Sequence, residues 1–196
     1  MKTDATSSLC GDFMLAVFLD DRGRVPGYRT GLGFGLSGAM LMELALGGFV
    51  DVLGGRVVAV PGAQPRDRAL GEALVRIRSS RRPRTAAEWV RVLSVGAHKR
   101  LAVGLIAEGV LAGRARRYDV LVGERRDTAI RSLAGTAGSS GRLIALAALA
   151  SACGAASDGW EWGEYEAVLR STSPACAQIL AAVADCVWRG TLSSWT

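Results

Sequence analysis

The sequence contains few of the residues that usually carry out chemistry. Of its 24 basic residues only Lys2 and Lys99 are lysines, and His98 is the single histidine. The four cysteines show no Cys-x-x-Cys spacing, so we expect free, buried thiols and no zinc site. No carboxylate pair and no serine near a histidine or lysine suggests a catalytic group. The sequence therefore predicts a non-enzymatic protein without a metal or cofactor.

Long apolar runs are also scarce. The most apolar segment, residues 143–153, is only half as long as the ~20 residues that a membrane-spanning helix requires. The first residues, MKTDATSSLCGDFM, hold one lysine and no long apolar stretch, unlike a signal peptide. We therefore expect a soluble, cytoplasmic protein, which can still associate peripherally with a membrane.

A phosphate-binding loop is not expected either. Residues 31–38, GLGFGLSG, are glycine-rich in the manner of a nucleotide loop. They lack the Gly-Lys-Ser/Thr ending of a P-loop, and no acidic residue follows at the ribose distance of a dinucleotide fold.

Arginine and apolar residues are abundant. With 196 residues and 49% hydrophobic content the chain can bury a full core, so we expect one domain over 1–196, with 1–8 and 191–196 loose. The net charge of +6 favours anionic partners, either a membrane surface or nucleic acid. Positive charge carried almost wholly by arginine is also typical of a GC-rich bacterial genome, so part of the basicity is compositional.

Hydrophobic periodicity predicts a mainly α protein. Thr85 and Glu88 have the spacing of a capping box at a helix start. A following helix has an apolar stripe at Ala97, Leu101 and Leu105, widened by Ile106, and is closed by Gly109 in a left-handed C-cap. Residues 142–153 predict a nearly all-apolar helix at the centre of the core. Other helices are expected at 36–46, 68–77, 128–133, 163–170 and 175–189, and residues 13–19 fit either a strand or a helix.

Two short β-hairpins are expected, at 49–60 and 110–122. In the first, Gly54-Gly55 separates two apolar strands. The second has a basic tip of Arg114, Arg116 and Arg117. Each hairpin follows a helix and a glycine, which is also how winged-helix modules end. Around Pro83 stand five further arginines, which form either an anion-binding patch or a solvated loop: Arg76, Arg78, Arg81, Arg82 and Arg84.

Several short segments, in order and spacing, resemble the Golgi phosphoprotein 3 family. The resemblance covers roughly residues 13–127 and is carried by LSGAMLMELAL at 36–46, GFV at 48–50, ALGEAL at 69–74, Trp89, and RLA with LIAEGVL within 100–111. It implies a mainly α single domain, with a central apolar helix surrounded by amphipathic helices and an exposed hairpin. With the pattern above, we expect this fold with two short β-hairpins. The resemblance also implies a non-enzymatic peripheral membrane adaptor.

Eukaryotic members of that family bind phosphatidylinositol 4-phosphate through an aromatic and several arginines, self-associate, and bind glycosyltransferase tails. By resemblance Tyr28 takes the aromatic position, while the arginine positions hold Ser37, Val95 and His98. The resemblance and the basic charge together suggest lipid head-group candidates at Tyr28, Arg29, His98, Lys99, Arg81, Arg82 and Arg84. A hairpin for membrane contact or self-association is suggested at Arg114, Arg116, Arg117, Val120, Leu121 and Val122.

The expected partner is an anionic membrane surface, with homo-oligomers and protein partners left open. Each basic residue near an anionic leaflet contributes on the order of 1 kcal/mol, so several on one face give usable, lipid-unspecific binding. The alternative is a nucleic-acid-binding protein with winged-helix-like units. It is less favoured, because the first helix before a hairpin carries Glu43 and the second is basic only at His98, Lys99 and Arg100.

Overall fold

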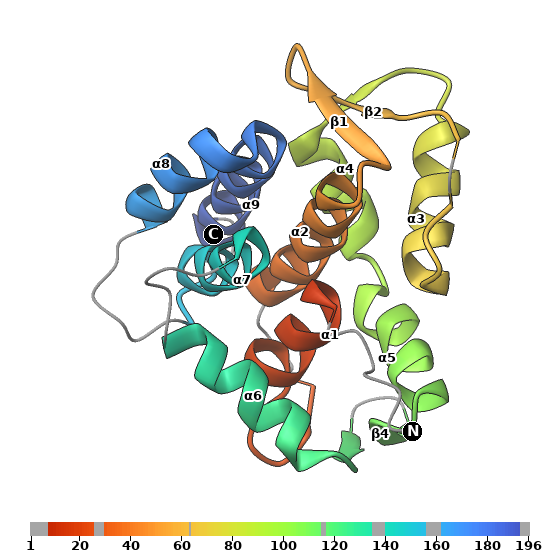
Figure 1. Ribbon diagram of the computed structural model, residues 1–196, viewed down its shortest axis with the longest axis vertical. Coiled ribbons are helices and arrows are strands. Elements are labelled where there is room, and N and C mark those ends of the chain that lie inside the picture. The colour runs from red at the N-terminus through yellow and green to blue at the C-terminus, as the bar shows by residue number, and fades with distance from the viewer. Residues whose placement is uncertain are drawn as a thin grey trace.

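The computed structural model describes residues 8–25, 30–62, 64–114, 117–134, 140–155 and 162–192 (Figure 1). This part of the chain is mainly helical with two small antiparallel sheets, as the sequence predicts. The helices are α1 (Leu9–Phe13), the π-helical turn η1 (Met14–Phe18), α2 (Thr30–Leu46), α3 (Arg68–Arg78), α4 (Ala86–Ser94), α5 (Ala97–Ala107), α6 (Gly123–Ala134), α7 (Gly141–Ala152), α8 (Trp162–Thr172) and α9 (Pro174–Leu192). The strands are β1 (Val50–Leu53), β2 (Arg56–Ala59), β3 (Arg84–Thr85), β4 (Leu111–Arg114) and β5 (Arg117–Val120).

Helix α2 is the central element. It contacts α1, α4, α5, α7 and α9, and the stretch 35–44 is buried along its whole length (Figure 1). The glycine-rich segment is therefore part of a core helix. A Cβ on Gly35 would clash with the Phe13 ring, and one on Gly38 would clash with Val183 of α9. These glycines let neighbouring helices approach closely, which explains their density without a ligand.

Helix α7 does not hold the central position that its composition predicts. Its residues 145–150 are buried, but it packs beside α2, between α1, α6, α8 and α9. Both helices are apolar all round. The two helices differ in their glycines: Gly35 and Gly38 of α2 let the side chains of α1 and α9 approach its backbone closely.

The two hairpins form as predicted. Gly54 and Gly55 have φ angles of 55° and 73°, which fits the tight two-residue turn between β1 and β2. Strand β3, which the sequence does not predict, pairs with β2 through Arg56–Thr85 and Val57–Arg84. The chain between α3 and α4 is thereby attached to the first hairpin.

The predicted helix ends are largely confirmed. Asp67 Oδ1 accepts a hydrogen bond from the Leu70 N–H and caps α3. Thr85 and Glu88 form the capping box of α4, and Gly109 follows α5 with a φ of 70°. Ile106 is 39% exposed and does not widen the buried stripe of α5.

Both chain ends of the described region are helical. Residues 9–18 resolve the strand-or-helix ambiguity in favour of α1 and η1, and the Ser8 hydroxyl accepts from the Gly11 N–H to cap α1. At the other end α9 runs to Leu192, so residues 191–192 belong to a helix. The helices share one continuous hydrophobic core.

Candidate anion-binding site

The connection between α3 and α4 carries three of the predicted candidates, Arg81, Arg82 and Arg84. Its backbone is fixed at two points: by β3, and by Arg56, whose Nη1 donates to the Pro83 carbonyl at 2.7 Å. The capping box at Thr85 then begins α4 directly after it. The arginines therefore project from a held segment and not from a free loop.

These arginines surround a hollow of about 480 Å³ between α3 and α4, called here the arginine hollow. Its floor includes Trp89, and the Arg84 guanidinium carbon lies 5.3 Å from the centroid of the Trp89 ring, a cation–π distance. The full lining is Arg76, Ser79, Ser80, Arg81, Arg82, Arg84, Trp89 and Val92.

Few acidic side chains neutralise these arginines. Arg82 Nη2 lies 3.3 Å from Glu88 Oε1, the one ion pair at the hollow among the described residues. The backbone N–H of Thr85 donates to Glu88 and is the main reason that the pKa of this carboxyl is lowered, so Glu88 is ionised at neutral pH. Within the described chain, no acidic side chain forms an ion pair with Arg76 or Arg81.

A second hollow of about 550 Å³ lies between α3 and α5, called here the α3–α5 hollow, and holds the predicted Lys99. It is lined by Arg68, Ala69, Glu72, Lys99, Arg100, Val103, Gly104 and Ala107. Arg100 Nη1 donates to the Val95 carbonyl at 2.8 Å and so caps the end of α4. Burial, followed by the nearby charge of Arg76, lowers the pKa of Arg100. Helix α3 contributes Arg68 and Glu72 to this hollow and Arg76 to the arginine hollow, so the two hollows adjoin along α3.

His98 does not join either lining. It stacks on Phe18 with ring centroids 5.7 Å apart and an interplanar angle of 18°. Burial, then the charges of Lys99 and Arg100, lower the pKa of His98, so the imidazole is neutral at neutral pH. His98 and Lys99 are neighbours in sequence, yet their side chains leave α5 in different directions because successive helical residues are about 100° apart.

Two other family-matched positions, Ser37 and Val95, line neither hollow. Ser37 is fully buried, and its hydroxyl donates to the Val90 carbonyl at 2.8 Å. Val95 is 75% exposed in the turn between α4 and α5. Tyr28 and Arg29 lie outside the described residues.

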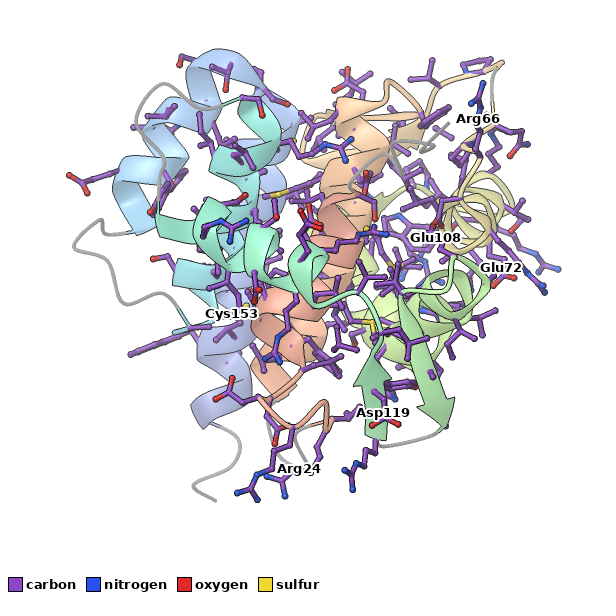
Figure 2. All side chains as sticks on the ribbon, turned by 60° about the horizontal axis from the view of Figure 1, so that its bottom comes forward. Arg24, Arg66, Glu72, Glu108, Asp119 and Cys153 are labelled. Carbon is purple, nitrogen blue, oxygen red and sulfur yellow. The ribbon has the colours of Figure 1, made fainter. Side chains whose placement is uncertain are left out.

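The second hairpin lies at the opposite end of the molecule from the chain between α3 and α4 (Figure 1). The Tyr118 N–H donates to the Gly23 carbonyl at 2.8 Å, so β5 is fixed to the loop before residue 26. Figure 2 shows Arg24 and Asp119 at this end, away from Glu72 on α3. Arg117, Leu121 and Val122 are exposed, and Val120 is half-buried. Arg116 and the side chain of Arg114 lie outside the described residues.

The structure therefore divides the predicted lipid candidates. Arg81, Arg82 and Arg84 lie together, Lys99 lies in the adjacent hollow, and His98 and the hairpin lie elsewhere. Sequence reasoning left Arg68 and Arg100 out of the candidate set and did not use Trp89. The helical spacing of Arg68, Glu72 and Arg76 on α3 could have indicated one basic face.

The described residues include no group of three His, Cys, Asp or Glu side chains that could hold a metal ion. Nor does any described helix combine the length and apolarity needed to cross a bilayer.

Fold and surface together define a class: mainly helical proteins built around one buried helix, with a cation-lined surface as the most distinctive feature. Within that class the chain belongs to the Golgi phosphoprotein 3 (GPP34) family, whose model matches residues 9–185. A search of curated proteins gave no match to the chain. The predicted resemblance is thus confirmed, and the match extends through the C-terminal helices to α9.

Proposed function

We propose that this protein is a non-enzymatic adaptor that associates peripherally with anionic membrane surfaces. The proposal is carried by one observation: the linings of the two adjoining hollows contain seven basic residues and one carboxylate, Glu72. We call this set the basic face; it comprises Arg68, Arg76, Arg81, Arg82, Arg84, Lys99 and Arg100. An adaptor role is consistent with membership of the family.

The magnitude of the charge supports reversible binding. Each cation that reaches an anionic leaflet contributes about 1 kcal/mol, so four or five acting together give an association that is measurable at low salt. The Debye length shortens from about 10 Å at 0.1 M salt to about 3 Å at 1 M, so binding by this face should weaken steeply with salt.

Head-group recognition at the family-matched positions is not part of the proposal. A buried serine hydroxyl that already donates to a carbonyl cannot replace an arginine fork at Ser37. His98 is neutral and stacked on Phe18. Charge on the basic face is the simpler basis for membrane association.

Flotation of the purified chain with liposomes tests this proposal. We expect binding to vesicles of phosphatidylcholine with phosphatidylserine, no binding to phosphatidylcholine alone, and release by moderate salt. The double variant Arg76→Gln/Arg81→Gln should weaken binding by roughly tenfold to thirtyfold.

A matched control distinguishes the effect of the basic face from the effect of net charge alone. Arg131 and Arg170 are exposed, and they belong to α6 and α8, two helices that lie across the molecule from α3 (Figure 1). The variant Arg131→Gln/Arg170→Gln removes the same charge and should bind nearly as wild type. Equal losses in the two variants, or no binding of the wild-type chain at low salt, would refute the proposal.

The nucleic-acid alternative gains no support from the helix–hairpin units. Helix α2 is enclosed by other helices and cannot enter a groove. On α5 the exposed positions include Val103 and Ile106, at 55% and 39%, where a recognition helix needs polar side chains that reach bases. Self-association and membrane contact through Leu121 and Val122 stay predictions, as do the further partners.

A further inference from the structure

The arginine hollow has a feature that general surface charge does not explain. Among the described residues, two buried donors without a hydrogen-bond partner belong to side chains that line this hollow: Arg84 Nε and Trp89 Nε1. The one other such atom in the described chain, Arg125 Nε, belongs to a guanidinium already paired with Glu108 at 2.8 Å. A buried donor without a partner is unfavourable, so two in contacting side chains mark this wall of the hollow as short of acceptor atoms.

The shape and rigidity of the hollow favour a small anion. Four arginines from α3 and from the α3–α4 connection line one depression. The connection is held by the β2–β3 pairing and by the Arg56–Pro83 hydrogen bond, and Arg84 is held over Trp89. Arg84, held over Trp89, therefore loses less side-chain entropy on binding than a free surface cation does.

The balance of charge favours a doubly charged ligand. Glu88 offsets part of the charge of Arg82, which leaves about three positive charges at the hollow. Planar guanidinium groups form paired hydrogen bonds with phosphate oxygens, and a phosphomonoester carries close to two negative charges at neutral pH. A carboxylate, with one negative charge, would leave most of the positive charge of the hollow unneutralised.

We propose that the arginine hollow is a binding site for a phosphomonoester group, held by Arg76, Arg81, Arg82 and Arg84. The group comes either from a lipid head group such as phosphatidic acid or from a soluble phosphate ester. The lipid source rests on the proposed membrane function, whereas the site itself does not. It is separate from the family-matched positions Ser37, Val95 and His98, none of which lines it.

The first arm of the test uses a soluble probe. Titration calorimetry of the full chain with glycerol 3-phosphate at constant ionic strength should show saturable, one-to-one binding. Arg81→Gln and Arg84→Lys should each weaken it by about tenfold, because the first loses a charge and the second keeps the charge but loses the fork. The control Arg131→Gln should bind as wild type. Circular dichroism and urea unfolding of each variant establish that it is folded.

The second arm uses vesicles with phosphatidic acid or phosphatidylserine, matched in surface charge. A preference for phosphatidic acid that Arg84→Lys abolishes identifies the lipid as the source. Glycerol 3-phosphate binding without that preference supports the site and identifies a soluble ester as the source, even where membrane binding fails altogether.

Two outcomes would overturn the site. In the first, all anionic vesicles bind equally and the soluble probe does not bind; the membrane proposal then survives without a specific pocket. In the second, a random DNA duplex binds tightly while glycerol 3-phosphate does not, which would make the face a general polyanion surface.

Discussion

The arginines of α6 and α7 differ from those of the arginine hollow in how their charges are neutralised. Three arginines on α6 and α7 form ion pairs: Arg125 pairs with Glu108, Arg126 with Asp21 and Arg142 with the buried Glu43. Arg76 and Arg81 at the arginine hollow have no acidic partner in the described chain. In a chain whose positive charge is nearly all arginine, composition cannot tell these uses apart. The pairing of each side chain does.

The largest expected effect comes from the most buried pair. Glu43 is 8% exposed; one carboxylate oxygen accepts from the Cys10 N–H at 3.1 Å and the other lies 2.9 Å from Arg142 Nη1. Glu43→Ala leaves the buried Cys10 N–H without its acceptor and removes the ion pair with Arg142, so we expect a loss of about 3 kcal/mol in the free energy of unfolding, measured with urea.

The exposed pair Arg68–Glu72 is its control. Its oxygen and nitrogen are 3.0 Å apart, but both side chains are solvated, so Glu72→Ala should cost less than about 1 kcal/mol. Equal losses in the free energy of unfolding for the two substitutions would show that burial does not strengthen the Glu43–Arg142 pair.

A second experiment substitutes one arginine on each side of the comparison. Arg126 donates to the carbonyls of Leu15 and Asp20 at 3.1 and 3.2 Å, and its side chain is only 15% exposed. Arg126→Gln should therefore destabilise the fold by about 2 kcal/mol. Arg76→Gln should change stability by less than about 0.5 kcal/mol while weakening anion binding. The reverse pattern would make Arg76 structural and remove the basis for the comparison.

The helices and their ends could be predicted from the sequence because local patterns determine them. The Thr85–Glu88 capping box, the Asp67 cap and the Gly54-Gly55 turn each depend on residues within a few positions of each other. The central position of α2 could not be predicted, because it depends on the approach of Phe13 and Val183 to glycines far away in sequence. Strand β3 was missed for the same reason: two residues gain strand structure only by pairing with β2.

The candidate site was predicted in part. The arginines around Pro83 do cluster, since they are close in sequence and in space. Sequence spacing could not show that Trp89 lies beneath Arg84, or that Arg76 one helix earlier completes the hollow. Sequence position also could not show that Ser37 and His98, at the family-matched positions, make contacts within the protein, and the role of His98 in lipid binding stays a prediction.

A smaller effect is expected where the scaffold of the hollow begins. Thr85 Oγ1 accepts from the Glu88 N–H at 3.2 Å, one of the two hydrogen bonds of the capping box. Thr85→Ala should cost about 1 kcal/mol, and Thr85→Ser should recover most of it, since serine is an equally good N-cap. Urea midpoints of the three proteins give this comparison. No difference between alanine and serine would mean that β3 alone holds the connection.

The smallest effect concerns His98, the only histidine. Burial and the charges of Lys99 and Arg100 lower its pKa in the folded protein, so the unfolded chain takes up the proton more readily. Stability from this residue is therefore full above the unfolded pKa of about 6.5 and is lost as the pH falls toward the lower folded pKa. His98→Phe keeps a ring to stack on Phe18 but cannot titrate. Its stability advantage over wild type should grow between pH 7 and pH 5, above the range in which carboxylates take up protons. If the stabilities of wild type and His98→Phe change in parallel over that range, the fold does not lower the pKa of His98.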